Sequence, residues 1–140
     1  DGNPNAPRIV YAFTDPNCPY CNRFWTAARP WVEAGKVQLR HVMVGVIRQD
    51  SPAKAAAILE ATSPEDALAK NELNYENGGI TPSQTVGPDM AAKLEANAAL
   101  MTELGFGGTP AIVFRKADGS VGTMAGLPQD AALEMILGPK

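Results

Sequence analysis

The sequence predicts one α/β domain, in which a strand–helix–strand unit and a strand–strand–helix unit are separated by a helical region. Three observations predict it. Apolar, β-branched runs occupy residues 8–14 and 37–47, with a helical pattern between them. Residues 51–105 carry helix start signals and alanine-rich stretches. Two strand-like runs follow on either side of a turn signal, and 140 residues suit a single domain with its own core.

The first unit begins with a strand over residues 8–14. This run is apolar at successive positions, as in a strand that helices cover on both faces, so we place it in the centre of the sheet. A helix is predicted from Cys18 to about residue 34, where Gly35 is a natural stop. Residues 37–47 are predicted to be the second strand. Because a helix connects the two strands, we expect them to pair in parallel.

The helical region is predicted to contain three helices. Ser51-Pro52 and Ser63-Pro64 each match an N-cap followed by proline at the first helical position. A third helix is predicted over residues 89–104, where apolar residues recur at helical spacing.

The last unit closes the sheet. Asp118-Gly119 is a strong hairpin signal between strand-like runs over residues 111–115 and 120–124. A final helix is predicted over residues 128–137, ended by Gly138. The chain therefore finishes with a strand–strand–helix unit.

The most informative stretch for chemistry contains Cys18 and Cys21, the only two cysteines in the chain. They lie where the first strand passes through a short loop into the first helix. The unpaired N–H groups and the positive dipole end of a helix N-terminus stabilise a thiolate, which is the reactive form of cysteine. Pro19 fits the first helical position and has no N–H, so the amides of Tyr20 and Cys21 are the expected donors to the Cys18 sulfur.

We therefore predict a redox-active pair. Cys18, expected to be the exposed cysteine, is the nucleophile, and Cys21, one turn inside the helix and more buried, is the resolving thiol. The pKa of Cys18 is expected to lie several units below the free-thiol value of about 8.5.

Two structural uses of the cysteines fit less well. A structural zinc site needs about four nitrogen or sulfur ligands, and the chain offers two cysteines and one histidine, His41. A disulfide that closes so short a loop would stabilise little. We predict no metal site and no cofactor other than the Cys18–Cys21 pair.

The stretch around the cysteines resembles the active site of the DsbC/DsbG family of periplasmic disulfide isomerases and reductases, and is closest to the DsbG branch. The sequence DPNCPYCNRFW carries the resemblance, which continues in shorter matches at residues 28–32, 35–40, 44–47, 109–112 and 126–128. It implies a thioredoxin-like catalytic domain over residues 8–140, with a helical insertion between the two halves of the fold. Residues 1–7, rich in proline, glycine and asparagine, are expected to be a linker remnant.

The resemblance also implies the rest of the site. Pro19 and Tyr20 are implied to tune the reduction potential of the cysteine pair. The bond between Thr109 and Pro110 is implied to be cis and to lie against the cysteines, with Thr109 presenting backbone groups to a substrate strand.

The resemblance leaves the base that serves Cys21 open. Thioredoxin and the DsbA oxidases have a buried acid six residues before the first cysteine, where this chain has Ala12. The isomerase branch also lacks that acid, so Ala12 favours the DsbC/DsbG family. Asp15 is the carboxylate nearest in sequence, and a role in capping the loop before the helix is an equally good hypothesis.

Composition excludes two classes of partner. The net charge of −3 leaves no basic field for nucleic acid, and no apolar run approaches the length of a membrane span. Cysteine count alone does not assign a compartment. The periplasmic location is implied by the resemblance, as are two partners: oxidised or misfolded periplasmic proteins, and a membrane thiol reductase of the DsbD type.

The leading hypothesis is a thiol–disulfide oxidoreductase that acts as a reductase or isomerase, with sulfenylated cysteines among the substrates that the resemblance implies. The alternatives are a DsbA-like oxidase and a chaperone-like binding module of a larger dimer. The family's dimerisation domain is not recognisable in these residues. We therefore expect these 140 residues alone to be monomeric, and the full-length protein to be a homodimer.

Overall fold

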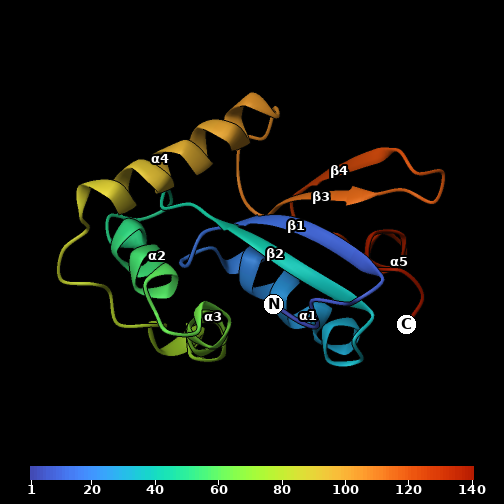
Figure 1. Cartoon of the computed structure of the whole chain (residues 1–140), viewed down its shortest axis with the longest axis horizontal. Coiled ribbons are helices and arrows are strands. Elements are labelled where there is room, and N and C mark those ends of the chain that lie inside the picture. Colours follow the sequence, from blue (N-terminus) through green and yellow to red (C-terminus); the bar gives the residue numbers. More distant parts are fainter.

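The computed structural model describes all 140 residues. They form one four-stranded sheet with helices around it (Figure 1). The strands are β1 (Arg8–Thr14), β2 (Val37–Met43), β3 (Ala111–Arg115) and β4 (Val121–Ala125). The helices are α1 (Pro19–Glu33), α2 (Ser51–Leu59), α3 (Pro64–Leu73), the short 3-10 helix η1 (Tyr75–Asn77), α4 (Pro88–Glu103) and α5 (Asp130–Leu137). The predicted order of a βαβ unit, a helical insertion and a ββα unit is confirmed.

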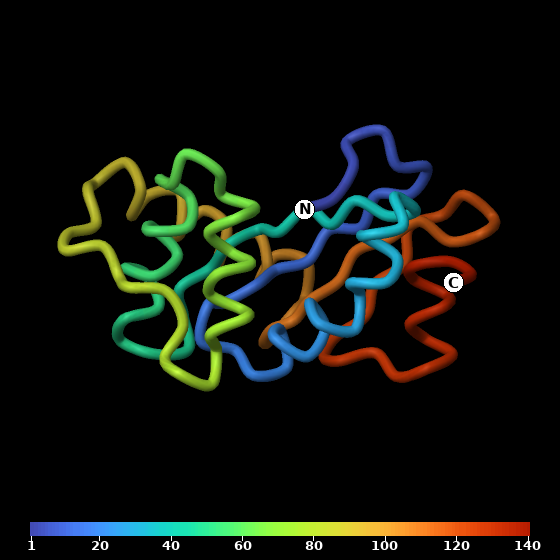
Figure 2. Tube along the Cα trace, turned by 90° about the horizontal axis from the view of Figure 1, so that it is seen from below, coloured from blue at the N-terminus to red at the C-terminus, as the bar shows by residue number.

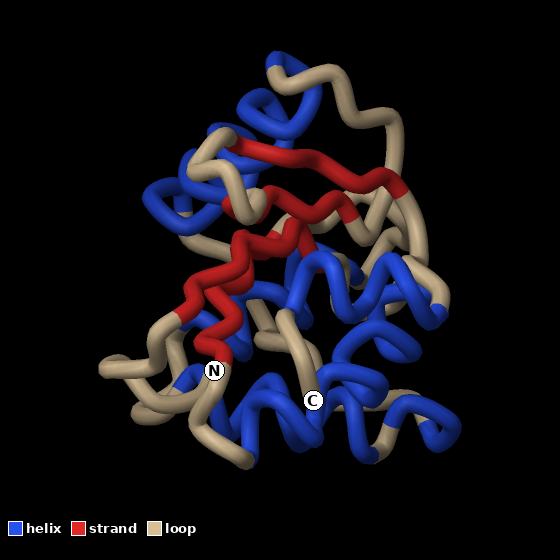
Figure 3. The backbone as a smooth tube through the Cα atoms, turned by 90° about the vertical axis from the view of Figure 1, so that its right-hand side faces the viewer, coloured by secondary structure: helices blue, strands red, loops and turns tan.

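The sheet has the strand order β2-β1-β3-β4. β1 pairs in parallel with β2 over its whole length, as predicted, and antiparallel with β3, which forms the predicted hairpin with β4. The strands twist relative to one another (Figure 3). β1 is therefore central, and the loop at its carboxyl end is where the cysteines lie.

Three apolar clusters hold these elements together. The largest packs α1 and α5 against β1, and in it the Trp31 indole donates a hydrogen bond to the Gly138 carbonyl at 2.8 Å. The second joins α1 to the insertion through Trp25, Met43 and Leu68. α2 and α3 lie at the opposite end of the molecule from the turn of the β3–β4 hairpin (Figure 2), and α4 reaches back to the start of β3. None of the helices combines the length and apolar character that crossing a membrane requires.

The predicted second strand is too long. In the structure, β2 ends at Met43, before the predicted end at residue 47. The amides of Val46 and Ile47 donate to Asp15 Oδ2 at 2.7 and 2.9 Å, so they are not available to a neighbouring strand. A tertiary contact overrides the strand propensity of this β-branched run.

Of the two serines predicted to be N-caps, Ser63 is one and Ser51 is not. Ser63 caps α3 through a hydrogen bond from the Asp66 amide at 3.3 Å. Ser51 is the first residue of α2 and not its N-cap, because its hydroxyl donates to Asp15 Oδ1 at 2.9 Å. The final helix begins at Asp130, two residues later than predicted.

The first two residues of the predicted linker lie against the domain. The Asp1 carboxylate binds Arg29 Nη1 at 3.0 Å and His41 Nε2 at 3.0 Å, and the Asp1 carbonyl accepts from the Leu39 amide at 2.8 Å. Gly2 has a φ of +103°, and a Cβ there would lie 2.8 Å from a β2 carbonyl oxygen. Residues 1 and 2 are thus fixed along β2.

Candidate functional site

Cys18 is the N-cap residue of α1, and Pro19 occupies the first turn. The Cys21 amide donates to the Cys18 sulfur at 3.0 Å, as the sequence predicts. Because Pro19 has no N–H, only the amides of the residues that follow it in the first turn can donate hydrogen bonds to the sulfur. The helix start therefore stabilises negative charge on Cys18.

A second segment approaches the sulfur from the other half of the fold. The bond between Thr109 and Pro110 is cis, and the Cys18 thiol lies 3.4 Å from the Thr109 carbonyl oxygen. The Thr109 hydroxyl is buried and has no hydrogen-bond partner. It is therefore free to donate to a thiolate, and this contact lowers the pKa of Cys18.

The two thiols differ in acidity. Hydrogen bonding from the Cys21 thiol is the largest of the effects that bring the pKa of Cys18 to about 7, and the Thr109 hydroxyl and the amides of Cys21 and Tyr20 add to it. Burial opposes them, which is why the decrease is smaller than the several units predicted. Burial, with the neighbouring Cys18, raises the pKa of Cys21 far above the ordinary value. Cys18 is thus the thiol that ionises first.

Exposure does not separate the two cysteines, and here the prediction is wrong. Cys18 and Cys21 are each 2% exposed. Pro19 and Tyr20 next to them are exposed, as is Gly108 on the opposite side. The exposed surface of Cys18 is therefore small, and Pro19, Tyr20 and Gly108 are the exposed residues that flank it.

The insertion holds the loop in front of Cys18 through Asn17. The Asn17 side chain donates to Ser51 Oγ at 2.8 Å and accepts from Lys54 Nζ at 2.9 Å. Its carbonyl accepts from the Tyr75 hydroxyl at 3.0 Å, and its amide donates to Asp15 Oδ1 at 2.9 Å. The residue adjacent to the nucleophile is therefore fixed by contacts with α2 and η1.

Asp15 completes this loop. Its carboxylate is fully buried and accepts hydrogen bonds from the amides of Asn17, Val46 and Ile47 and from the Ser51 hydroxyl. Four donors occupy its two oxygens. The geometry favours the loop-capping role of Asp15 over that of a base for Cys21.

Comparison with known proteins assigns the family. The sequence model of the family described as a thioredoxin-like domain matches residues 3–138. The chain belongs to the thioredoxin-like domain family. Over all of its residues it is 47% identical to the thiol:disulfide interchange protein DsbG of Pseudomonas aeruginosa and 44% identical to that of Escherichia coli. The resemblance to DsbG is confirmed. The chain spans 55% and 56% of the lengths of these relatives.

Solved structures confirm the thioredoxin-like fold. The catalytic domain of Proteus mirabilis ScsC aligns with a TM-score of 0.73 at 22% identity, covering 97% of this chain and 84% of that one. Pseudomonas aeruginosa DsbA2 aligns with a TM-score of 0.69 at 13% identity, covering 94% and 87% of the two chains.

This thioredoxin-like domain contains a buried carboxyl group near the site that the sequence analysis does not include. Ala12 is buried, and nothing acidic replaces it on β1. Glu72 of α3, only 5% exposed, accepts from Asn22 at 3.2 Å and from Asn71 at 2.6 Å. Burial, more than any other cause, raises the pKa of Glu72 to about 7, and the charge of Cys18 contributes to this increase.

The sequence signal for the missed residues is weak. Glu72 lies in a helix whose other charged residues, Glu65, Asp66 and Lys70, are exposed, and Lys54 lies in an alanine-rich helix whose only other polar residue is Ser51. A charged residue at a position that helical periodicity assigns to a buried face is the one pattern that would have identified them.

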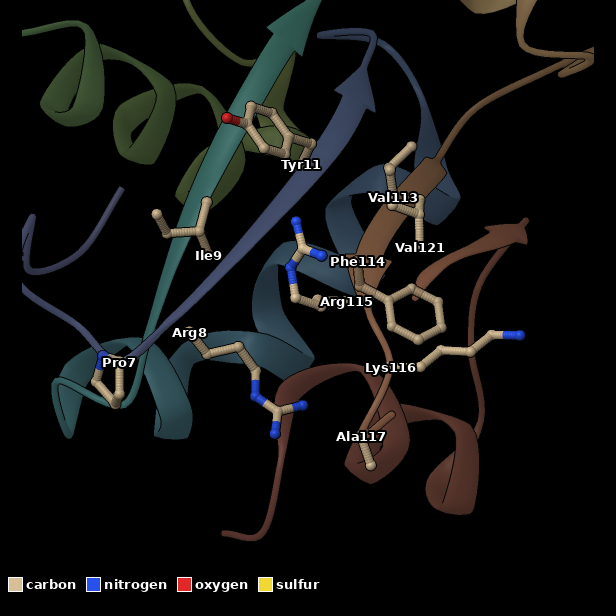
Figure 4. Close-up of a pocket in the computed structure, with 10 residues that line it drawn as sticks. All are labelled: Pro7, Arg8, Ile9, Tyr11, Val113, Phe114, Arg115, Lys116, Ala117 and Val121. Carbon is tan, nitrogen blue, oxygen red and sulfur yellow. The ribbon is translucent and has the colours of Figure 1, made fainter. Parts of the chain in front are cut away.

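A surface groove of the thioredoxin-like domain lies away from the cysteines. It has a volume of about 580 Å³ and lies over β1, β3 and β4, where Ile9, Tyr11, Val113 and Val121 line it (Figure 4). α4 packs over the other end of this sheet face, near Phe13. The cysteine site lies instead between the start of α1 and the Thr109 loop, and no cysteine lines this groove.

Proposed function

We propose that this chain is the catalytic domain of a periplasmic thiol–disulfide oxidoreductase of the DsbG type. One observation carries the proposal: Cys18 is an N-cap residue whose sulfur accepts the Cys21 amide at 3.0 Å, with a pKa of about 7. A substantial fraction of Cys18 is then a thiolate at neutral pH. The identity to two proteins named thiol:disulfide interchange proteins supports the same activity.

The first step forms a mixed disulfide. The Cys18 thiolate attacks one sulfur of a substrate disulfide, the substrate S–S bond breaks, and the other substrate sulfur leaves as a thiolate that takes a proton from solvent. Thr109 and Pro110 are proposed to bind the substrate chain beside Cys18, and Pro19 and Tyr20 to tune the potential of the pair.

The second step releases the substrate. Cys21 loses its proton to solvent and attacks the Cys18 sulfur, so the Cys18–Cys21 disulfide forms and the bond between Cys18 and the substrate breaks. The substrate sulfur leaves as a thiolate that takes up a proton, and the substrate is then a dithiol, reduced by two electrons. The hydrogen bond and charge of Cys18 raise the pKa of Cys21 in the free enzyme. Both effects disappear when Cys18 is in a mixed disulfide, so Cys21 becomes more acidic when it is needed.

The electrons are proposed to be stored in the cysteine pair alone and to be restored by a membrane thiol reductase of the DsbD type. Oxidised or misfolded periplasmic proteins, including those with sulfenylated cysteines, are the proposed substrates. The same chemistry run in reverse would be that of a DsbA-like oxidase. The redox state of the pair in cells separates the two: we expect it to be reduced.

The test is trapping. With a disulfide-containing protein as substrate, Cys21→Ser should accumulate a mixed disulfide through Cys18, because the release step is lost. Cys18→Ser should form none. Adducts of Cys18→Ser in equal yield would reverse the assignment. Suppression of aggregation by Cys18→Ser, measured by light scattering, would instead support a chaperone-like binding module.

A further inference from the structure

Glu72 is a buried acid without a cationic partner. Its side chain lies on α3 and is 5% exposed, and it takes part in none of the ion pairs of the structure. A buried carboxylate that is not paired costs free energy compared with one in water. The neutral form is therefore favoured unless neighbouring groups stabilise the charge.

The hydrogen bonds of Glu72 reach both sides of the cysteine pair. Oε1 accepts from Asn22 Nδ2 at 3.2 Å, and Asn22 follows Cys21 on α1. Oε2 accepts from Asn71 Nδ2 at 2.6 Å, and the same amide donates to the Pro16 carbonyl at 3.0 Å. The carboxyl group is thus linked to the loop before Cys18 and to the helix after Cys21.

Few charges surround the Glu72 carboxyl group. It borders a groove of about 540 Å³ between α1 and η1, and the charged or titratable residues of that groove are Arg29, Glu33, Tyr75 and Glu76. Arg29 is bound to Asp1, and from α2 the buried Lys54 is bound to Asn17 and to the Gly78 carbonyl. Arg29 lowers the pKa of Glu72, and a Cys18 thiolate raises it.

We propose that Glu72 is a positioning residue that controls the ionisation of Cys18 and so the pH range of thiol exchange. The inference rests on the proposed role of Cys18 as the nucleophile. Two like charges disfavour each other, so a Glu72 carboxylate makes the Cys18 thiolate harder to form, and the thiolate keeps Glu72 protonated. Because the pKa of each group is about 7, the two titrate as a pair, in two overlapping steps.

This coupling has a consequence during the reaction. When Cys18 enters a mixed disulfide its charge is lost, and the pKa of Glu72 falls. The ionised fraction of Glu72 then rises, and the protons that it gives up pass to the solvent of the adjacent groove. The thiolate that leaves the substrate takes up its own proton from solvent, so the proton balance is closed.

The test is the titration of Cys18 in reduced protein, followed by thiolate absorbance at 240 nm and by the rate of alkylation. Glu72→Gln keeps an oxygen for Asn22 and removes the charge. We expect its thiolate to form in a single step at lower pH, with alkylation of Cys18 between pH 7 and 8 faster by up to about twofold. At pH 6 the two proteins should react at nearly the same rate, because Glu72 is then mostly neutral in the wild type. Glu76→Gln, an exposed carboxylate of the same groove, is the matched control and should leave both measurements unchanged.

A second variant keeps the test decisive if Glu72→Gln does not fold. Asn22→Ala removes a hydrogen bond that lowers the pKa of Glu72, so Glu72 stays neutral to higher pH and the Cys18 titration should shift in the same direction. Unchanged titrations in the folded variants, with normal trapping through Cys18, would overturn the role of Glu72 alone. Loss of trapping through Cys18 would overturn the proposed function and this inference with it.

Discussion

Lys54 Nζ lies 2.9 Å from Asn17 Oδ1, so an ammonium group of the helical insertion holds the residue directly before Cys18. Lys54 is 7% exposed and also donates to the Gly78 carbonyl at 2.8 Å. Burying an ammonium group is costly unless its donors are satisfied. The insertion is therefore part of the machinery that fixes the active-site loop.

Lys54→Met tests this contact. The substitution keeps an apolar stem and leaves Asn17 Oδ1 and the Gly78 carbonyl without a donor, so we expect the free energy of unfolding to fall by about 2–3 kcal/mol. Urea unfolding of the reduced protein measures it. Lys70→Met, at an exposed position on α3, is the control and should change stability by less than about 0.5 kcal/mol. Equal stabilities of the two variants would contradict a structural role for Lys54.

Thr109→Val tests the buried hydroxyl beside Cys18. The hydroxyl has no other partner, so removing it should not lower the free energy of unfolding, but it should raise the pKa of Cys18. We expect the thiolate absorbance midpoint to rise by about 0.5–1 pH unit. Thr109→Ser keeps the hydroxyl and should retain the wild-type midpoint. An unchanged midpoint in Thr109→Val would show that the hydroxyl does not reach the thiolate.

The local part of the site can be predicted from the sequence because it depends on neighbours in the chain. The spacing of Cys18 and Cys21, with proline between them at a helix start, is enough to predict the 3.0 Å amide contact. The contacts between Lys54 and Asn17 and between Glu72 and Asn22 join residues 37 and 50 positions apart. Periodicity gives the face on which a residue lies, but not the polar partner that another element brings to it.

The predicted end of β2 and the predicted start of α2 are wrong for a similar reason. The β-branched run up to residue 47 has the propensity of a strand. Only the folded chain shows that Asp15 accepts hydrogen bonds from the amides of Val46 and Ile47. Ser51 has the pattern of an N-cap, yet the same carboxylate accepts its hydroxyl. One buried aspartate thus accounts for two of the wrong boundaries.

The stability of the reduced protein should depend on pH in two opposite ways. The pKa of Glu72 is raised from 4.5 to about 7, so its stabilising contribution is complete below pH 4.5 and is lost as the pH rises through about 7. The pKa of Cys18 is lowered from 9.0 to about 7, so its contribution is present above pH 9 and is lost as the pH falls through about 7. Each group contributes on the order of 2–3 kcal/mol. Burial lowers the pKa of His41 from 6.5 to about 3, so His41 adds stability as the pH rises toward 6.5 and opposes the loss from Glu72. The contribution of each group is therefore measured as the difference between a variant and the wild type.

Urea unfolding at pH 4.5, 7 and 9 measures this dependence. Relative to the wild type, Glu72→Gln should gain stability at pH 7 compared with pH 4.5, and Cys18→Ser should lose the increase between pH 7 and 9. If each variant keeps the wild-type difference over its own interval, the assigned groups do not cause it.

The last prediction concerns these 140 residues by themselves. Thiol exchange at Cys18 depends on the helix start, the Thr109 loop and the Asn17 contacts, all of which lie within the chain. Isomerisation requires more, because the enzyme must stay bound to a misfolded substrate while its disulfides exchange. In the family that the chain resembles, two catalytic domains face a shared cleft, which raises the effective concentration of substrate at each thiolate.

A single domain with one cysteine pair has no second catalytic surface of this kind. We expect a monomer with dithiol reductase activity and little isomerase activity on a substrate with scrambled disulfides. Sedimentation gives the mass, and parallel reductase and isomerase assays give the two activities. A stable dimer would contradict the prediction, and the exposed apolar residues Ile9, Tyr11 and Val121 over the sheet would be the first place to look for its interface. Isomerase turnover equal to that of a full-length DsbG would show that one site suffices to hold the substrate.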